Sequence, residues 1–137
     1  MLNLPIEPSQ MLIYGVAIAA GLVYLPYMVV AYGRVSIGID MSAPRAMFDR
    51  LPDFAKRATW AHQNSFEVFA LFAAAALTSY VTQTASAQTS LYVLVFLAAR
   101  FLFSLFYILD WPWLRSPMWV IGMICIGGLF TASLQAV

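Results

Sequence analysis

The sequence predicts an all-α integral membrane protein, folded as a bundle of four transmembrane helices. Of the 137 residues, 63% are hydrophobic and only 9% are charged, whereas a soluble domain carries roughly 25% charged residues. The apolar residues also fall in four long runs with few charges, each near the roughly 20 residues that a helix needs to cross a bilayer. The length leaves room for one compact domain, residues 1–137, and for no separate soluble domain.

The four spans can be placed in order along the chain. The first, residues 11–33, carries no charge, and Pro26 is expected to kink it. The second covers residues 57–81, and the third, residues 90–109, is interrupted by Arg100. The fourth covers residues 117–134, and its pair Gly127-Gly128 predicts a close helix contact. Ser116 and Pro117 are predicted to start this helix, because serine is a favoured N-cap and proline a favoured first helical residue.

Charge predicts how the bundle is oriented in the membrane. Outside the third span, the basic residues lie in two loops. The first loop and its edges contain Arg34, Arg45, Arg50, Lys56 and Arg57, and the third loop contains Arg115. By the positive-inside rule, both loops face the cytoplasm and both chain termini lie on the other side. The N-terminal residues lack the basic region of a signal peptide, so we expect them to be retained. The short loops favour a bacterial inner-membrane protein.

The remaining composition excludes some functions. A net charge of +1 argues against a nucleic-acid partner, which calls for a basic patch. No Cys/His spacing indicates a metal site, and Cys125 in its apolar run is interpreted as an inert hydrophobe. The first loop, residues 34–56, mixes both signs of charge. We interpret it as a solvated connector, except for Arg34, which ends the first span. The alternative is that the loop holds a short interfacial helix.

Polar residues of the second and third spans are the main candidates for a site. At about 100° per residue, one side of the second helix carries Arg57, Trp60, Asn64, Glu67 and Leu71. His62 falls well off that side and need not share its pocket. Glu67 lies ten residues after Arg57, and Arg100 lies ten residues before Asp110, so both charges are expected at similar depth. A buried charge needs a partner, which predicts a Glu67–Arg100 ion pair.

A second group of polar residues lies at the cytoplasmic ends of the last two spans. Arg100, Ser104 and Tyr107 share one face of the third helix, and Arg115 and Ser116 open the fourth. A helix N-terminus beside Arg115 predicts an anion or thiolate site. Each feature also has a structural interpretation: an ion-pair clamp, a helix cap at Ser116 or an interfacial anchor at Tyr107. We favour a functional site because these residues gather on the cytoplasmic half instead of scattering across both leaflets.

These motifs resemble those of a known family. The string Ala61-His-x-Asn-x-x-Glu67, followed by Arg100-x6-Tyr107 and Arg115-Ser116, is similar to the pattern of the MAPEG family, the membrane-associated proteins of eicosanoid and glutathione metabolism. The likeness covers nearly the whole chain. It implies a homotrimer of four-helix bundles that binds glutathione, as a co-substrate, between neighbouring subunits near the cytoplasmic side. It implies no metal.

The resemblance also implies roles for individual residues. Arg115 matches the arginine that stabilises the glutathione thiolate, Ser116 matches a serine that hydrogen-bonds the thiol, and Tyr107 is implied to assist. Arg100 matches a buried arginine that holds Glu67. The residues implied to bind glutathione are Arg34, Arg57, His62, Asn64, Glu67 and Arg100. Trp60 and Gln63 stand where studied members carry arginines, so two cationic contacts are missing, and Arg57 is expected to compensate in part.

The hypothesis from the sequence is a trimeric, glutathione-dependent transferase or peroxidase that acts on lipophilic electrophiles or lipid hydroperoxides reaching it from the membrane lipid. One alternative is a small transporter that uses Glu67 as a proton-coupled switch. Pairing with Arg100 argues against it, because a paired carboxylate stays ionised. Another alternative is a family relative that has lost catalysis and binds lipid or a partner protein.

Overall fold

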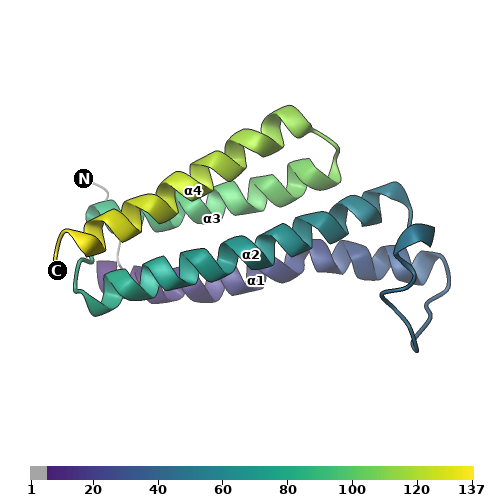
Figure 1. Cartoon of the computed structure of the whole chain (residues 1–137), viewed down its shortest axis with the longest axis horizontal. Coiled ribbons are helices and arrows are strands. Elements are labelled where there is room, and N and C mark those ends of the chain that lie inside the picture. The colour runs from purple at the N-terminus through teal and green to yellow at the C-terminus, as the bar shows by residue number, and fades with distance from the viewer. Residues whose placement is uncertain (1–5) are drawn as a thin grey trace.

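The computed structural model describes residues 6–137, and the N-terminal tail up to residue 5, which we expected to be retained, lies outside the described residues. Four helices follow one another along the chain: α1 (Pro8–Ser36), α2 (Asp53–Val81), α3 (Ala87–Ile108) and α4 (Pro112–Leu134). They run alternately in opposite directions, so the α1–α2 and α3–α4 connections lie at the same end of the bundle (Figure 1). We call this end, formed by residues 34–57 and 107–116, the basic end.

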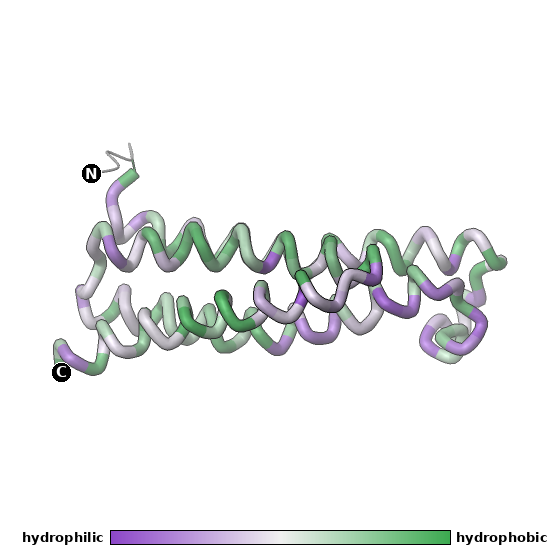
Figure 2. Tube along the Cα trace, turned by 90° about the horizontal axis from the view of Figure 1, so that it is seen from above, coloured by the Kyte–Doolittle hydropathy of each residue, from purple (hydrophilic) through white to green (hydrophobic). Residues whose placement is uncertain are grey.

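The bundle has the features of an integral membrane protein. All four helices are long and apolar enough to cross a membrane, and residues 6–137 contain no strand. The predicted all-α, four-span fold is therefore confirmed. Hydrophilic residues gather in the α1–α2 connection, whereas the middle of the bundle is largely apolar (Figure 2). At the basic end, α1 and α2 extend beyond α3 and α4 (Figure 1), so this connection lies farther out than the α3–α4 turn.

Local capping signals set the start of α3, three residues before the predicted span. The Ser86 hydroxyl oxygen accepts the Thr89 backbone N–H at 3.2 Å, and the Thr89 hydroxyl accepts the Ser86 N–H at 2.8 Å. This reciprocal pair satisfies backbone donors that a helix start otherwise leaves free. α2 likewise starts at Asp53, directly after the extended Pro52. The predicted spans missed these first turns because their residues are polar.

The predicted start of α4 is wrong. The helix begins at Pro112, with Trp111 as its N-cap, and Pro117 lies inside it. Ser116 is therefore not a cap, and its hydroxyl donates back to the Pro112 carbonyl at 3.2 Å. Pro112 and Pro117 are both favourable first residues of a helix, and α4 begins at Pro112. A three-residue turn before it, with Asp110 in the left-handed region at φ 61°, reverses the chain.

The core is centred on two stacked rings in the middle of the bundle. Phe72 of α2 and Phe96 of α3 lie face to face, with ring centroids 3.9 Å apart, and both are at most 1% exposed. Lipid tails are as apolar as these side chains, so helix association depends on close packing. A Cβ atom on Gly128 would lie 2.6 Å from the Tyr92 ring. The close contact predicted for Gly127-Gly128 is thus made by Gly128, against α3.

Candidate functional site

The residues predicted to form one site fall into three separate places in a single protomer. A buried cluster surrounds Arg100 between α2 and α3. A cationic pair, Arg115 with Tyr107, lies on the α3–α4 hairpin at the basic end. An open groove lies on α1, α2 and the connection between them. The contacts in each place decide which chemistry it can support.

The buried cluster gives Arg100 neutral hydrogen-bond partners through Nη2, whereas its Nη1 is buried and has no hydrogen-bond partner among residues 6–137. Arg100 is 5% exposed, and its Nη2 donates hydrogen bonds to Asn64 Oδ1 and Ser65 Oγ, both at 3.1 Å. Its guanidinium carbon also lies 4.2 Å from the centroid of the Phe103 ring, a favourable place for a cation. These contacts join α3 to α2 deep in the bundle. Ser65 was missed in the sequence, because a lone serine in an apolar helix has no distinguishing pattern.

The predicted ion pair between Glu67 and Arg100 is wrong. The ion pair found within residues 6–137 joins Arg57 to Asp110 instead, and the Glu67 side chain is exposed. The two charges do lie at matching positions along antiparallel helices, but they lie on different sides of α2. Glu67 comes two residues after Ser65, which rotates it about 160° around the helix axis. Ser65 faces Arg100, and Glu67 therefore faces away.

Arg57 contacts the end of α3. Its Nε donates to the Ile108 carbonyl at 3.1 Å, and its Nη1 lies 3.7 Å from Asp110 Oδ2. The carbonyl belongs to the last turn of α3, where no backbone donor is available. The Asp110 side chain is 69% exposed, so this ion pair contributes little by itself. Arg57 thus fastens α2 to the α3–α4 turn, on the side of α2 that faces α3.

The cationic pair brings together two residues that the sequence singled out. The guanidinium carbon of Arg115 lies 4.3 Å from the centroid of the Tyr107 ring, and both side chains are half-buried. The predicted helix N-terminus at Ser116 and Pro117 is absent, because α4 starts at Pro112. The Arg115 N–H already donates to the Trp111 carbonyl at 3.0 Å. The positive charge available to an anion here is therefore that of the guanidinium group.

The groove has a volume of about 660 Å³ and lies against the outer side of α1 and α2. Its lining residues from the helices are Tyr27, Val30, Arg34, Thr59, His62, Gln63, Phe66 and Glu67, and those from the connection are Pro44, Arg45, Phe48 and Leu51. His62 and Glu67 thus share one pocket, although the helical projection had separated them. Asn64 is not in it. The groove combines cationic, anionic and aromatic side chains, which suits a zwitterionic ligand better than a plain hydrocarbon.

His62 is held in one orientation on the groove wall. Its Nδ1 lies 2.8 Å from the Val23 carbonyl oxygen on α1. A carbonyl can only accept a hydrogen bond, so Nδ1 carries the proton, and in the neutral ring Nε2 is left as an acceptor. The rings of Tyr24 and Tyr27 flank the imidazole, with centroids 5.9 Å and 5.3 Å away.

The connection over the groove is folded. Most of residues 40–51, which we call the strap, are exposed, as expected of a solvated connector, but two of its apolar residues are buried. Met47 and Leu51 are 2% and 3% exposed. Asp40 Oδ1 accepts the backbone N–H groups of Ser42 and Ala43, at 2.9 Å and 3.2 Å, and η1 (Phe48–Arg50) follows. The alternative of a short helix is realised as this 3-10 turn. The mixed charges of this segment predicted a solvated loop, and the two buried apolar residues were therefore missed in the sequence.

The groove and the cationic pair lie on opposite sides of α2. Arg57 and Asn64 point toward α3 and its turn, as their hydrogen bonds show. Phe66 lines the groove, and it lies about 160° around the helix axis from Asn64. Tyr107 and Arg115 belong to α3 and α4, whereas the groove is formed by α1, α2 and the strap. The two places therefore face different sides of one protomer.

Comparison with known proteins places the chain in a family. Searches of curated proteins and of solved structures find no significant match. A family model does match, over residues 11–135, which includes all four helices except the first three residues of α1. This range also contains the Ala-His-x-Asn-x-x-Glu string, Arg100, the cationic pair and the strap. The chain belongs to the MAPEG family, whose proteins are associated with glutathione and eicosanoid metabolism.

Proposed function

We propose that the protein is a glutathione-dependent transferase or peroxidase that acts on lipophilic electrophiles or lipid hydroperoxides. The observation that carries the proposal is the Arg115–Tyr107 pair, with the guanidinium carbon 4.3 Å from the ring centroid, in a MAPEG family member. The aromatic face holds the guanidinium group at the basic end. An arginine held this way is suited to bind a sulfur anion.

The chemistry requires a thiolate. A cysteinyl thiol has a pKa near 8.5, so only a small fraction is ionised at neutral pH. A charge-assisted hydrogen bond from Arg115 contributes on the order of 1–2 kcal/mol, and each 1.36 kcal/mol of preference for the thiolate lowers the thiol pKa by about one unit. The proton leaves to solvent. The thiolate sulfur then bonds to the electrophilic carbon, either displacing a leaving group that departs as an anion or adding across an activated double bond whose other carbon takes a proton from solvent. With a hydroperoxide, the sulfur bonds to the terminal oxygen as the O–O bond breaks, and the alkoxide takes a proton from solvent and leaves as an alcohol. A second glutathione molecule then reduces the resulting sulfenic acid, which gives glutathione disulfide and water.

The groove supplies contacts for the rest of the tripeptide. Glutathione at neutral pH carries two carboxylates and one ammonium group, and the groove presents Arg34, Arg45 and the carboxylate of Glu67. These charges are complementary in sign and number. The Nε2 acceptor of His62 and the amide of Gln63 suit the peptide groups between the charged ends. Under this proposal, Arg34, His62 and Glu67 bind glutathione directly, whereas Asn64, Arg57 and Arg100 hold the helices.

We propose that the protein is a homotrimer, and the split geometry supports a site shared between neighbouring copies. The groove and Arg115 face opposite sides of α2, and one glutathione molecule reaches both where a neighbouring copy presents its Arg115–Tyr107 pair over the groove. The lipophilic substrate then approaches the subunit boundary from the bilayer. We further propose that the basic end faces the cytoplasm, where glutathione is available, with the chain termini on the other side of a bacterial inner membrane. The distribution of basic residues supports this orientation.

A second candidate, a small proton-coupled transporter, is favoured by one observation. Glu67 is exposed and does not pair with Arg100, whose hydrogen bonds go to Asn64 and Ser65. The argument that an ion pair keeps this carboxylate ionised therefore no longer holds. Against transport stands the tightly packed centre of the bundle, where the Phe72 and Phe96 rings are stacked 3.9 Å apart.

The experiment that tests the enzymatic proposal is ultraviolet difference absorbance in the thiolate band as glutathione is added to the purified protein. The Arg115→Ala variant serves as the test and Arg50→Ala, an exposed change in η1, as the control. We expect a saturable thiolate signal in the unmodified and control proteins and its loss in Arg115→Ala. A thiolate signal that survives in Arg115→Ala rejects the role of Arg115. No signal in any form, with the assembly intact, rejects the glutathione proposal and favours lipid binding or transport.

A further inference from the structure

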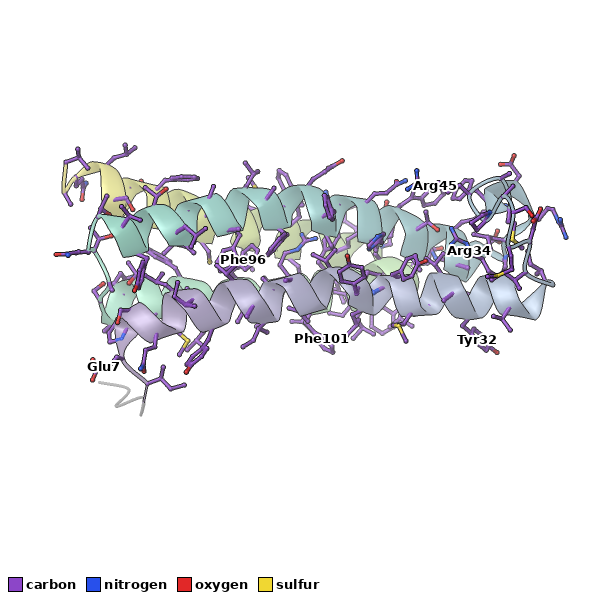
Figure 3. All side chains as sticks on the ribbon, turned by 90° about the horizontal axis from the view of Figure 1, so that it is seen from below. Glu7, Tyr32, Arg34, Arg45, Phe96 and Phe101 are labelled. Carbon is purple, nitrogen blue, oxygen red and sulfur yellow. The ribbon has the colours of Figure 1, made fainter. Side chains whose placement is uncertain are left out.

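Arg45 is the groove residue that the sequence left without a role. It lies in the strap, between Pro44 and the anchoring residues Met47 and Phe48, and its side chain is part of the groove lining. Figure 3 shows the labelled Arg45 and Arg34 side chains at the same end of the bundle, on the side of α1 and α2. Two guanidinium groups from segments eleven residues apart in the sequence therefore line one groove.

The strap holds Arg45 in place through a contact with α2. The Phe48 ring lies 5.9 Å, centroid to centroid, from the Trp60 ring. Met47, also in the strap, is only 2% exposed. The Met47 sulfur also accepts the Asp40 backbone N–H at 3.2 Å. These contacts fasten the strap on both sides of Arg45. The rim of the groove is therefore a defined structure, and the Phe48–Trp60 contact is one of those that hold the backbone around Arg45.

The charges around the groove are unbalanced. Among residues 6–137, neither Arg34 nor Arg45 takes part in an ion pair, since the one present joins Arg57 and Asp110. The Nε of Arg34 is buried and has no hydrogen-bond partner within the same range. Glu67 is the carboxylate that lines the groove. Two guanidinium groups that share one groove repel each other, and an anion between them relieves this repulsion and satisfies the free donors.

We propose that Arg34 and Arg45 form a carboxylate clamp, with Arg34 on the floor and Arg45 on the rim. The clamp selects peptide thiols that carry two carboxylates, and Trp60 is a positioning residue that acts through the strap. This inference rests on the proposed glutathione site and adds to it a specificity-determining residue from the first connection. A peptide thiol with neutral ends lacks the groups that the clamp binds.

The test compares glutathione binding to the unmodified protein and to Arg45→Ala, Arg45→Lys and Arg50→Ala by equilibrium dialysis in detergent. Arg50 lies in the same strap but does not line the groove, which makes it a matched control. We expect Arg45→Ala to weaken binding about tenfold, the effect of roughly one charge-assisted hydrogen bond. Arg45→Lys should recover part of the affinity, and Arg50→Ala should bind like the unmodified protein.

Glutathione diethyl ester, in which both carboxylates are replaced by neutral esters, serves as a second ligand. It distinguishes the loss of a carboxylate contact from a general disturbance of the strap. The ester should bind weakly to every form, with no further loss in Arg45→Ala. An equal loss for ester and free glutathione would mean that Arg45 acts without a carboxylate, which overturns the clamp. If the unmodified protein binds glutathione and Arg45→Ala binds it equally well, the proposed clamp is rejected and the proposed glutathione site stands. If no form binds glutathione, the proposed function fails and the clamp with it.

Discussion

Arg100 of α3 donates a hydrogen bond from Nη2 to Oδ1 of Asn64 on α2, with the two atoms 3.1 Å apart. This contact explains how a cation is tolerated inside the bundle without a carboxylate beside it. The asparagine oxygen, the Ser65 hydroxyl and the face of Phe103 replace part of the water that the guanidinium group has lost, while its Nη1 has no hydrogen-bond partner within residues 6–137. It also leaves Glu67 free to line the groove. The Ala-His-x-Asn-x-x-Glu string therefore serves two separate places, one structural and one on the surface.

The first prediction concerns this contact. Replacement of Asn64 by Leu removes one acceptor from a buried guanidinium group and should lower the stability of the protein by about 1–3 kcal/mol. The measurement is thermal unfolding in detergent, followed by circular dichroism. Gln63→Leu is the matched control, because Gln63 is the exposed neighbour on the same helix. Equal unfolding temperatures for the two variants would show that the Arg100–Asn64 bond contributes nothing measurable.

A second prediction uses two adjacent glycines in α4. A Cβ atom on Gly128 would lie 2.6 Å from the Tyr92 ring, whereas one on Gly127 meets nothing within 4 Å. Gly128→Ala should therefore destabilise the protein by about 1–3 kcal/mol through overpacking. Gly127→Ala should be neutral or slightly stabilising, since alanine favours the helix. The same unfolding experiment checks both, and a destabilisation that is larger at Gly127 would place a neighbouring subunit against that side of α4.

The third prediction separates Arg115 from Ser116. The Ser116 hydroxyl already donates to the Pro112 carbonyl at 3.2 Å, and it lies on the solvent-exposed side of α4. Under the proposed function, Arg115→Ala should reduce kcat/KM for conjugation by about 10²-fold, the cost typical of losing a group that stabilises developing charge. Ser116→Ala should reduce it by less than about tenfold, because a neutral hydrogen bond is weaker than a charge-assisted one. A larger loss in Ser116→Ala would make the serine the main thiol ligand.

A fourth prediction distinguishes the enzyme from the transporter. Glu67→Gln keeps the size of the side chain but removes the charge that would pair with the ammonium group of glutathione. If the protein is the proposed enzyme, this variant binds glutathione more weakly, and neither form moves protons across liposomes. If it is a proton-coupled transporter, the unmodified protein acidifies liposomes along a substrate gradient and Glu67→Gln does not. Thr59→Val, another change on the groove wall, controls for nonspecific effects on the liposomes.

The fold was predictable from the sequence because membrane helices are specified by length and apolarity alone. The site was predictable only in part. Depth along a helix follows from counting residues, which placed Glu67 and Arg100 at matching levels. Whether two residues face each other also depends on how the helices are rotated, and that rotation is set by packing such as the Phe72–Phe96 stack. The ion pair was wrong for this reason, and Ser65 was missed for the same one.

The fold of the strap was not predicted from the sequence, for a different reason. Its Asp and Arg residues are typical of a solvated loop, and its apolar residues Met47, Phe48 and Leu51 are too few to predict an anchored segment. Leu51 packs in a buried cluster with Val30, Ala55 and Ala58, and the Phe48 ring contacts the Trp60 ring on α2. Trp60, which departs from the arginine of studied relatives, therefore contributes one of the contacts that hold the strap.

The last prediction tests that link directly. Trp60→Ala removes the ring that packs against Phe48, a contact of the kind that contributes about 0.5–1.5 kcal/mol. The strap should then open more often, because local stability depends on its few buried contacts. Trypsin should cleave after Arg45 and Arg50 several-fold faster than in the unmodified protein, as followed by mass spectrometry.

Trp113→Ala is the matched control for this experiment, since Trp113 is 89% exposed and lies on α4, away from the strap. Glutathione added before the protease should slow cleavage of the unmodified protein if Arg45 closes on the ligand, and should protect Trp60→Ala less. Cleavage at equal rates in Trp60→Ala and Trp113→Ala would show that the strap is held by Met47 and Leu51 alone. In that case Trp60 has no positioning role, and any loss of glutathione affinity on its replacement must come from a direct contact with the ligand.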